Sequence, residues 1–143
     1  MPLEEQDIEV RDIPNREIEL AGVTVHTRRQ DRHSAPTLGF RFGDLLTWIT
    51  DTAYDEDSAR FAAGSGALAH ESWYSSFAPR NPDIHSSATQ AAQVASDAGV
   101  SNLLLVHLPP FQAALDELLV EARAGFEQSV LAEDGADVSP LLR

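Results

Sequence analysis

Apolar and polar residues alternate over several short stretches in the first half of the chain, and a period of two predicts β-strands. Residues 18–29 are expected to form two short strands that turn at Ala21-Gly22. Residues 37–42 carry apolar side chains on one face, and residues 45–49 form a short apolar run after the turn at Gly43-Asp44. These two stretches therefore predict a hairpin.

Helical signals dominate the second half. Ser87 and Gln90 have the spacing of a capping box, which predicts a helix start there. Small apolar residues recur at helical spacing after it, and Gly99 is expected to end the helix. The same period predicts a helix over residues 112–126, and an acidic first turn favours a shorter one over residues 54–63.

Each of these helices is followed by an apolar run, and the three runs predict strands over residues 67–70, 103–106 and 130–132. Strands that alternate with helices are typical of an α/β (α+β) layered domain. The charged and weakly patterned residues 1–15 are expected to be a flexible acidic lead-in, and residues 16–143 to be one domain.

Composition narrows the possible functions. The formal net charge of -13 in 143 residues opposes non-specific binding to nucleic acid, which depends on basic side chains. No run of about 18 apolar residues is present and no signal pattern opens the chain, so we expect a cytoplasmic protein without a membrane span. Cysteine is absent, so His, Asp or Glu must hold any metal, which suits zinc, manganese or iron.

The side chains that could carry chemistry lie at the ends of predicted elements. Asp51, His70-Glu71 and His107 each end an apolar strand, His33 lies in a loop, and His85 precedes a helix. Taken singly, Asp51 could be a helix cap and each histidine a hydrogen-bonded core residue. Because ligands gather at strand ends in layered α/β proteins, the whole set favours a metal or catalytic site.

Five segments in this order resemble a known family. They are His33–Arg41, Thr50–Thr52, Leu68–Glu71, His85–Ala92 and Leu105–Pro110. The succession resembles the C-terminal half of a metallo-β-lactamase-fold hydrolase, within the ribonuclease Z-like branch, over roughly residues 17 to 135. The resemblance implies half of an αββα sandwich, with a mixed sheet and helices on one of its faces.

The resemblance also implies roles for single residues. Asp51 would bridge two metal ions, of which His33 would bind one and His107 the other. His85 would donate a proton or hydrogen bond to the reacting group, and Glu71 would orient it or a metal ligand. A two-metal site of this kind would activate water against a phosphodiester or ester bond.

Two departures from the family limit this interpretation. The motif His-x-His-x-Asp-His, which the family carries in its N-terminal half, is absent, so each ion would keep two ligands. We therefore expect a weak or inactive enzyme unless a second copy in a homodimer or a missing N-terminal half completes the site. The alternative is a metal-free half-domain that serves as an assembly or interaction module.

The second departure concerns the substrate. Enzymes of this family that process transfer RNA carry a basic arm between the two strands that precede the bridging aspartate. Here the stretch from Arg41 to Asp51 leaves room for only a hairpin turn in place of that arm. Together with the acidic charge, this favours a small phosphodiester or ester over nucleic acid.

Overall fold

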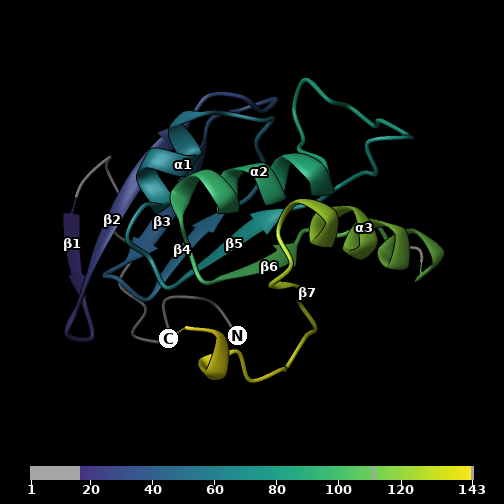
Figure 1. Ribbon diagram of the computed structural model, residues 1–143. Coiled ribbons are helices and arrows are strands. Elements are labelled where there is room, and N and C mark those ends of the chain that lie inside the picture. Colours follow the sequence, from purple (N-terminus) through teal and green to yellow (C-terminus); the bar gives the residue numbers. More distant parts are fainter. Residues whose placement is uncertain (1–16, 111, 143) are drawn as a thin grey trace, which may run out of the picture.

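One mixed sheet of seven strands forms the framework, and its strands lie in the order of the chain (Figure 1). In the computed structural model, which describes residues 17–110 and 112–142, neighbouring strands are antiparallel from β1 to β4 and parallel from β4 to β7. The strands are β1 (Glu17–Leu20), β2 (Val23–Gln30), β3 (Thr37–Phe42), β4 (Leu46–Ile49), β5 (Ala67–Glu71), β6 (Asn102–Val106) and β7 (Ser129–Leu131). The predicted layered class and mixed sheet are confirmed.

Each parallel connection contains a helix, because a crossover between parallel strands needs a long segment. The helices are α1 (Asp57–Ala62), α2 (Ala88–Ala98) and α3 (Gln112–Gly125). All three cover the same face of the sheet (Figure 1), where Leu68, Leu103 and Leu118 belong to one buried apolar cluster. The predicted placement of helices on one face is therefore confirmed.

The predicted start and end of α2 are also confirmed. The Ser87 hydroxyl accepts from the Gln90 amide, and the Gln90 side chain accepts from the Ser87 amide. Gly99 closes the helix in the left-handed region with φ of 68°. The buried residues of this helix are Ala88, Ala91, Ala92, Val94, Ala95 and Ala98. Their small side chains let α2 lie close to the sheet and to α3.

Helix α1 is shorter than the expected 54–63 because Asp55 bonds elsewhere. Its carboxylate accepts from the Asp57 amide at 3.0 Å and pairs with the Arg28 guanidinium on β2 at 3.1 Å. The segment before Asp57 is thereby tied to the sheet, and the helix begins at Asp57.

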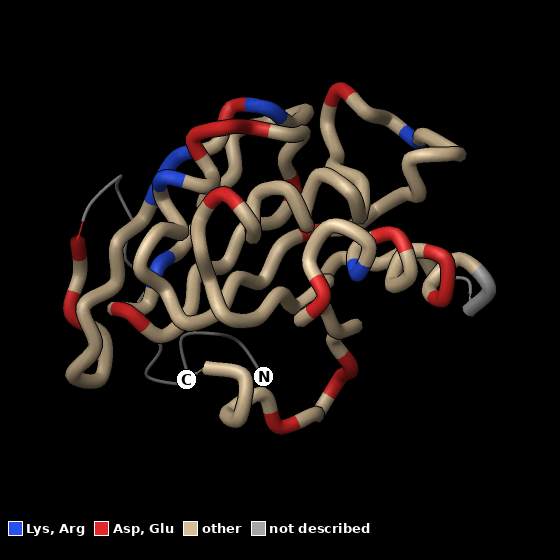
Figure 2. Tube along the Cα trace, in the orientation of Figure 1, with Lys and Arg blue, Asp and Glu red and all other residues tan. Residues whose placement is uncertain are grey.

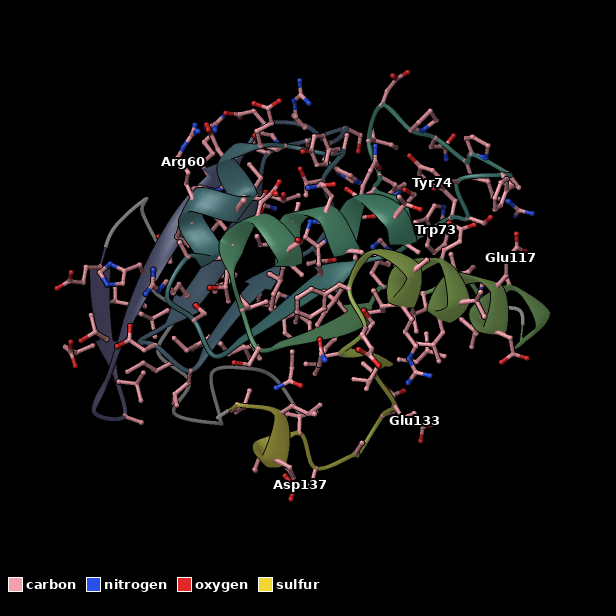
Figure 3. The ribbon with its side chains drawn as sticks, in the orientation of Figure 1. Arg60, Trp73, Tyr74, Glu117, Glu133 and Asp137 are labelled. Atoms are coloured by element: carbon pink, nitrogen blue, oxygen red, sulfur yellow. The ribbon has the colours of Figure 1, made fainter. Side chains whose placement is uncertain are left out.

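The sheet face opposite the helices is only partly open. The C-terminal segment, with the 3-10 helix η2 (Ser139–Leu141), packs there through Val138, Leu141 and Leu142 against Leu104 and Val106. Leu104 is consequently 3% exposed. Figure 3 shows Glu133 and Asp137 on this segment, across the sheet from the helices.

The lead-in over residues 1–15 lies outside the described residues. No described helix is long and apolar enough to cross a membrane, and a cytoplasmic location stays a prediction. Figure 2 shows acidic positions on α3 and along the C-terminal segment, whereas basic ones concentrate near β2 and α1.

Candidate metal centre

The candidate site lies where the parallel strands end. Asp51, Glu71 and His107 stand at or just after the C-terminal ends of β4, β5 and β6, which are neighbours in the sheet. The loop that carries His33 reaches the same edge because β3 is antiparallel to β4, and the Thr37 hydroxyl donates to the Asp51 carbonyl at 3.0 Å. The structure thus brings the predicted residues to one edge.

Asp51 is the centre of this arrangement. One of its oxygens, Oδ1, lies 3.8 Å from His33 Nε2 and 3.6 Å from His107 Nδ1. Asp51 and His107 both adopt positive φ, 53° and 47°, which is uncommon for residues other than glycine. Such backbone strain concentrates at functional sites. Ala21 and Asn81 also adopt positive φ, but Asp51 and His107 are the pair whose side chains face each other, 3.6 Å apart.

The distances from Asp51 Oδ1 to His33 Nε2 and to His107 Nδ1 are too long for hydrogen bonds, and each fits a pair of ligands on a metal ion better. Two ligands of a tetrahedral zinc ion, each about 2.1 Å from it, lie roughly 3.4 Å apart. Within the described residues His107 Nδ1 is buried and has no hydrogen-bond partner. Because an unpaired buried nitrogen is costly, a cation between it and Asp51 Oδ1 would satisfy both groups. The donor set of one carboxylate and two imidazoles suits zinc, manganese or iron.

His85 lies beside these residues and is held by Glu71. Its Nδ1 is 3.0 Å from Glu71 Oε2, and the Glu71 side chain is 0% exposed. The same carboxyl group accepts from the backbone amides of Thr52 at 2.5 Å and Ser86 at 3.2 Å. Glu71 thus links the segment after Asp51 to the segment that carries His85, and it leaves the second ring nitrogen of His85 free of this bond.

Burial controls the protonation of this pair. Loss of solvent raises the pKa of Glu71 to about 8, although the amides of Thr52 and Ser86 lower it and Asp51 adds to the rise. Loss of solvent also lowers the pKa of His85 from its usual value, with smaller contributions from His107 and His33 in the same direction and an opposing one from Asp51. Both effects favour uncharged partners, which suits a proton shared along the 3.0 Å contact.

The imidazole rings form a compact cluster against one indole. The ring centroid of His85 lies 5.2 Å from that of His33 and 5.3 Å from that of His107. Trp73 lies 5.3 Å from His85 and 5.0 Å from His107. The sequence did not single out Trp73 as a site residue. Its only signal was the unusual number of aromatic residues in the loop after β5.

A further cluster shares two of these residues. Glu71, His85 and His107 each offer a ligand atom, and these atoms lie within 4.8 Å of one another. Since His85 Nδ1 and a Glu71 oxygen already bond to each other, this set competes poorly with the donors around Asp51.

Two other histidines do not join the site. His70 is fully buried, its Nδ1 contacts the Glu71 carbonyl at 2.9 Å, and burial lowers its pKa to about 4. His26 lies on β2, is exposed, and is 3.5 Å from the Glu17 carboxylate. Proximity in sequence to Glu71 therefore does not make His70 part of the centre.

Comparisons with known proteins bear on this geometry. No family model matches the chain. A protein named ribonuclease Z from Synechococcus sp. (strain WH7803) is 39% identical over 109 residues, covering 70% of this chain and 34% of its own length. Ribonuclease Z from Thermoplasma volcanium is 41% identical over 98 residues, covering 67% and 32%. The chain thus spans about a third of the length of the curated relatives it matches.

Solved structures agree on the fold. The metallo-beta-lactamase fold protein YhfI from Bacillus subtilis superposes with a TM-score of 0.79 at 22% identity, over 94% of this chain and 58% of that one. The short form of human tRNase Z gives a TM-score of 0.61 at 19% identity, over 83% and 44%. A diphosphatase of the PhnP family gives 0.67 at 19%, over 90% and 47%.

The sheet order, the helices on one face and the strand-end residues define a protein of the metallo-β-lactamase fold. The sequence matches place the chain more narrowly. It belongs to the ribonuclease Z-like branch of this fold, and it corresponds to part of the relatives that it matches.

Proposed function

We propose that this chain provides the Asp51-centred part of the active site of a metal-dependent hydrolase that cleaves a phosphodiester or ester bond. The observation that carries the proposal is the position of Asp51 Oδ1, 3.8 Å from His33 Nε2 and 3.6 Å from His107 Nδ1. The unpaired, buried His107 Nδ1 supports the same interpretation.

Each residue of the site has a distinct task in this proposal. Asp51, His33 and His107 would hold divalent metal, with zinc favoured and manganese or iron as alternatives, and Asp51 would be the bridging ligand of a two-ion site. A divalent ion held by these residues would supply Lewis-acid chemistry, which polarises a phosphoryl or carbonyl oxygen.

His85 would hand a proton or hydrogen bond to the leaving or developing oxyanion from its outward nitrogen. Glu71 would fix the ring of His85, because it bonds His85 Nδ1 at 3.0 Å and is itself held by two backbone amides. The indole of Trp73 lies against both rings, 5.3 Å from that of His85 and 5.0 Å from that of His107.

The chain lacks the motif His-x-His-x-Asp-His, so the proposed ions need ligands from elsewhere. We propose that either a second copy of this chain or an N-terminal half of the fold supplies them. A groove of about 620 Å³ on the sheet face opposite the helices supports this, since its apolar walls include Leu46 and Trp48 and it reaches His107. A protein surface seated there would adjoin the site.

Light scattering after size exclusion tests the dimer. A two-fold homodimer at micromolar concentration is the expected result, since isologous contacts are the commonest way to cover such a face. A folded monomer would sink the homodimer and leave the N-terminal half as the partner to seek.

A small phosphodiester or ester is the proposed substrate. The short link between Arg41 and Asp51 and the net charge of -13 support it. The relatives named ribonuclease Z count against it and make an RNA phosphodiester the competing substrate. The assay should therefore offer both bis(p-nitrophenyl) phosphate and a short RNA.

Elemental analysis of the purified protein together with these two assays tests the proposal. The chain alone is expected to retain less than one metal ion and to turn over slowly, with zinc raising the rate and Asp51→Ala removing that increase. Two tightly held ions with ready turnover would overturn the need for a partner. In the homodimer, or in a complex with an N-terminal half, a rate that added metal leaves unchanged would overturn the hydrolase itself.

The second candidate is a metal-free interaction module. The apolar groove favours it, since Trp48 stays 37% exposed there. An interaction module should bind its partner equally well after Asp51→Ala or in the presence of a chelator. A hydrolase should form an active complex, and either treatment should abolish its activity.

A further inference from the structure

Trp73 occupies a fixed position between two elements of the site. Its indole lies 5.3 Å from the His85 ring and 5.0 Å from the His107 ring, at interplanar angles of 34° and 37°. Its backbone is tied down as well, because the Trp73 amide donates to the Ser86 carbonyl at 3.0 Å and the next residue, Tyr74, forms a bridge with Ser87. Figure 3 shows Trp73 beside the start of α2.

The two histidines differ in how they are held. The Glu71 carboxyl group fixes the His85 ring through Nδ1. A histidine that binds metal is ordinarily oriented in this way, by a hydrogen bond to its second nitrogen. Within the described residues, neither ring nitrogen of His107 forms a hydrogen bond, and the buried Nδ1 faces Asp51 Oδ1 at 3.6 Å. Its close neighbours there are Asp51 and the rings of His85 and Trp73.

We infer that Trp73 is the positioning residue for His107, and that its indole replaces the hydrogen bond that usually orients a metal-binding imidazole. The indole is large enough to contact both rings, so it also sets the spacing between the ring that faces Asp51 and the ring that faces the substrate. The inference rests on the proposed metal centre and names a residue outside its ligand set.

Nuclear magnetic resonance of the histidine rings tests this inference without metal. In the wild-type protein the indole should displace the carbon-bound ring proton signals of His107 and His85 through its ring current. Trp73→Leu should move these signals towards those of a freely rotating histidine, and Trp73→Phe should restore most of the displacement. Phe77→Leu is the matched control, because Phe77 lies in the same loop and is 85% exposed.

Cobalt binding, measured by calorimetry and by the visible spectrum of the bound ion, provides the second readout. Trp73→Leu should weaken binding by about tenfold, at the lower end of the range for residues that orient metal ligands. Trp73→Phe should stay within about threefold of the wild type, and Phe77→Leu should be unchanged. A changed cobalt spectrum in Trp73→Leu at saturation would show altered ligand geometry, which a general loss of stability does not produce.

The outcomes separate the inference from the proposed function. Unchanged histidine signals in a folded Trp73→Leu protein would overturn the inference, and so would unaltered cobalt affinity. If the wild type binds no cobalt, the proposed function fails, and the histidine signals alone decide whether Trp73 positions the ring.

Discussion

The buried His70 makes stability depend on pH in a defined direction. Its ring is 0% exposed, and loss of solvent is the largest cause that lowers its pKa from 6.5 to about 4, with Arg28 acting in the same direction and the Glu71 carbonyl opposing it. The unfolded chain takes up a proton at this side chain near pH 6.5, but the folded chain does so only near pH 4. The contribution of the neutral His70 to the free energy of unfolding is therefore fully present above pH 6.5, and it is lost as the pH falls towards 4.

The magnitude follows from the two pKa values. Between about pH 7.5 and about pH 5, the free energy of unfolding should fall by about 2 kcal/mol through His70 alone. Glu71 acts in the opposite direction, because its pKa rises from 4.5 to about 8 and the folded state gains protons first as the pH falls. A variant that changes His70 and keeps Glu71 has the same Glu71 contribution as the wild type, so this contribution cancels when the two pH dependences are subtracted.

His70→Asn is the suitable variant. Its amide nitrogen can keep the contact that His70 Nδ1 makes with the Glu71 carbonyl at 2.9 Å, but it does not titrate. Urea unfolding at the two pH values should show a loss that is about 2 kcal/mol smaller in His70→Asn than in the wild type. His26→Asn, at an exposed position, should retain the wild-type loss. Equal pH dependence in the wild type and His70→Asn would refute the reasoning.

Two further predictions concern the helical layer. Ser87→Ala removes the hydroxyl that caps α2 and should lower the free energy of unfolding in urea by about 1 kcal/mol. Ser87→Asp should keep most of the wild-type stability, because aspartate also caps helices. An unchanged urea midpoint in Ser87→Ala would contradict the role of the cap. Leu118→Ala removes a fully buried side chain from the cluster shared by α2, α3 and the sheet, and it should lower the free energy of unfolding by about 3 kcal/mol in the same assay. Val120→Ala, at an exposed position on α3, should leave this free energy nearly unchanged. Similar losses in both variants would show that α3 is packed differently.

Local signals account for the parts of the fold that the sequence predicted. The capping box at Ser87 and Gln90 and the turn at Ala21-Gly22 depend on neighbouring residues, and both occur as expected. The positions of Asp51 and His107 at strand ends likewise predicted that they share one edge of the sheet, and they do so because β4 and β6 both run parallel to β5 between them.

Contacts between distant segments could not be predicted in this way. Nothing in the local pattern of Val138–Leu142 indicates that it lies on the second sheet face, where the Leu141 carbonyl accepts from the Asn102 amide group at 2.9 Å. The place of Trp73 depends on pairing of its segment with residues 86–88, which periodicity does not reveal. The late start of α1 depends on the pairing of Asp55 with Arg28, on a strand remote in sequence.

The most direct test of the account is a calorimetric titration of zinc into three proteins, the wild type, Asp51→Ala and His26→Ala. The account predicts measurable binding to the wild type, because Asp51 Oδ1 faces His33 Nε2 at 3.8 Å and His107 Nδ1 at 3.6 Å. Asp51→Ala should abolish it, and His26→Ala should leave it unchanged, since His26 lies exposed on β2. Equal loss in both variants, or wild-type affinity in Asp51→Ala, would contradict a metal centre at Asp51.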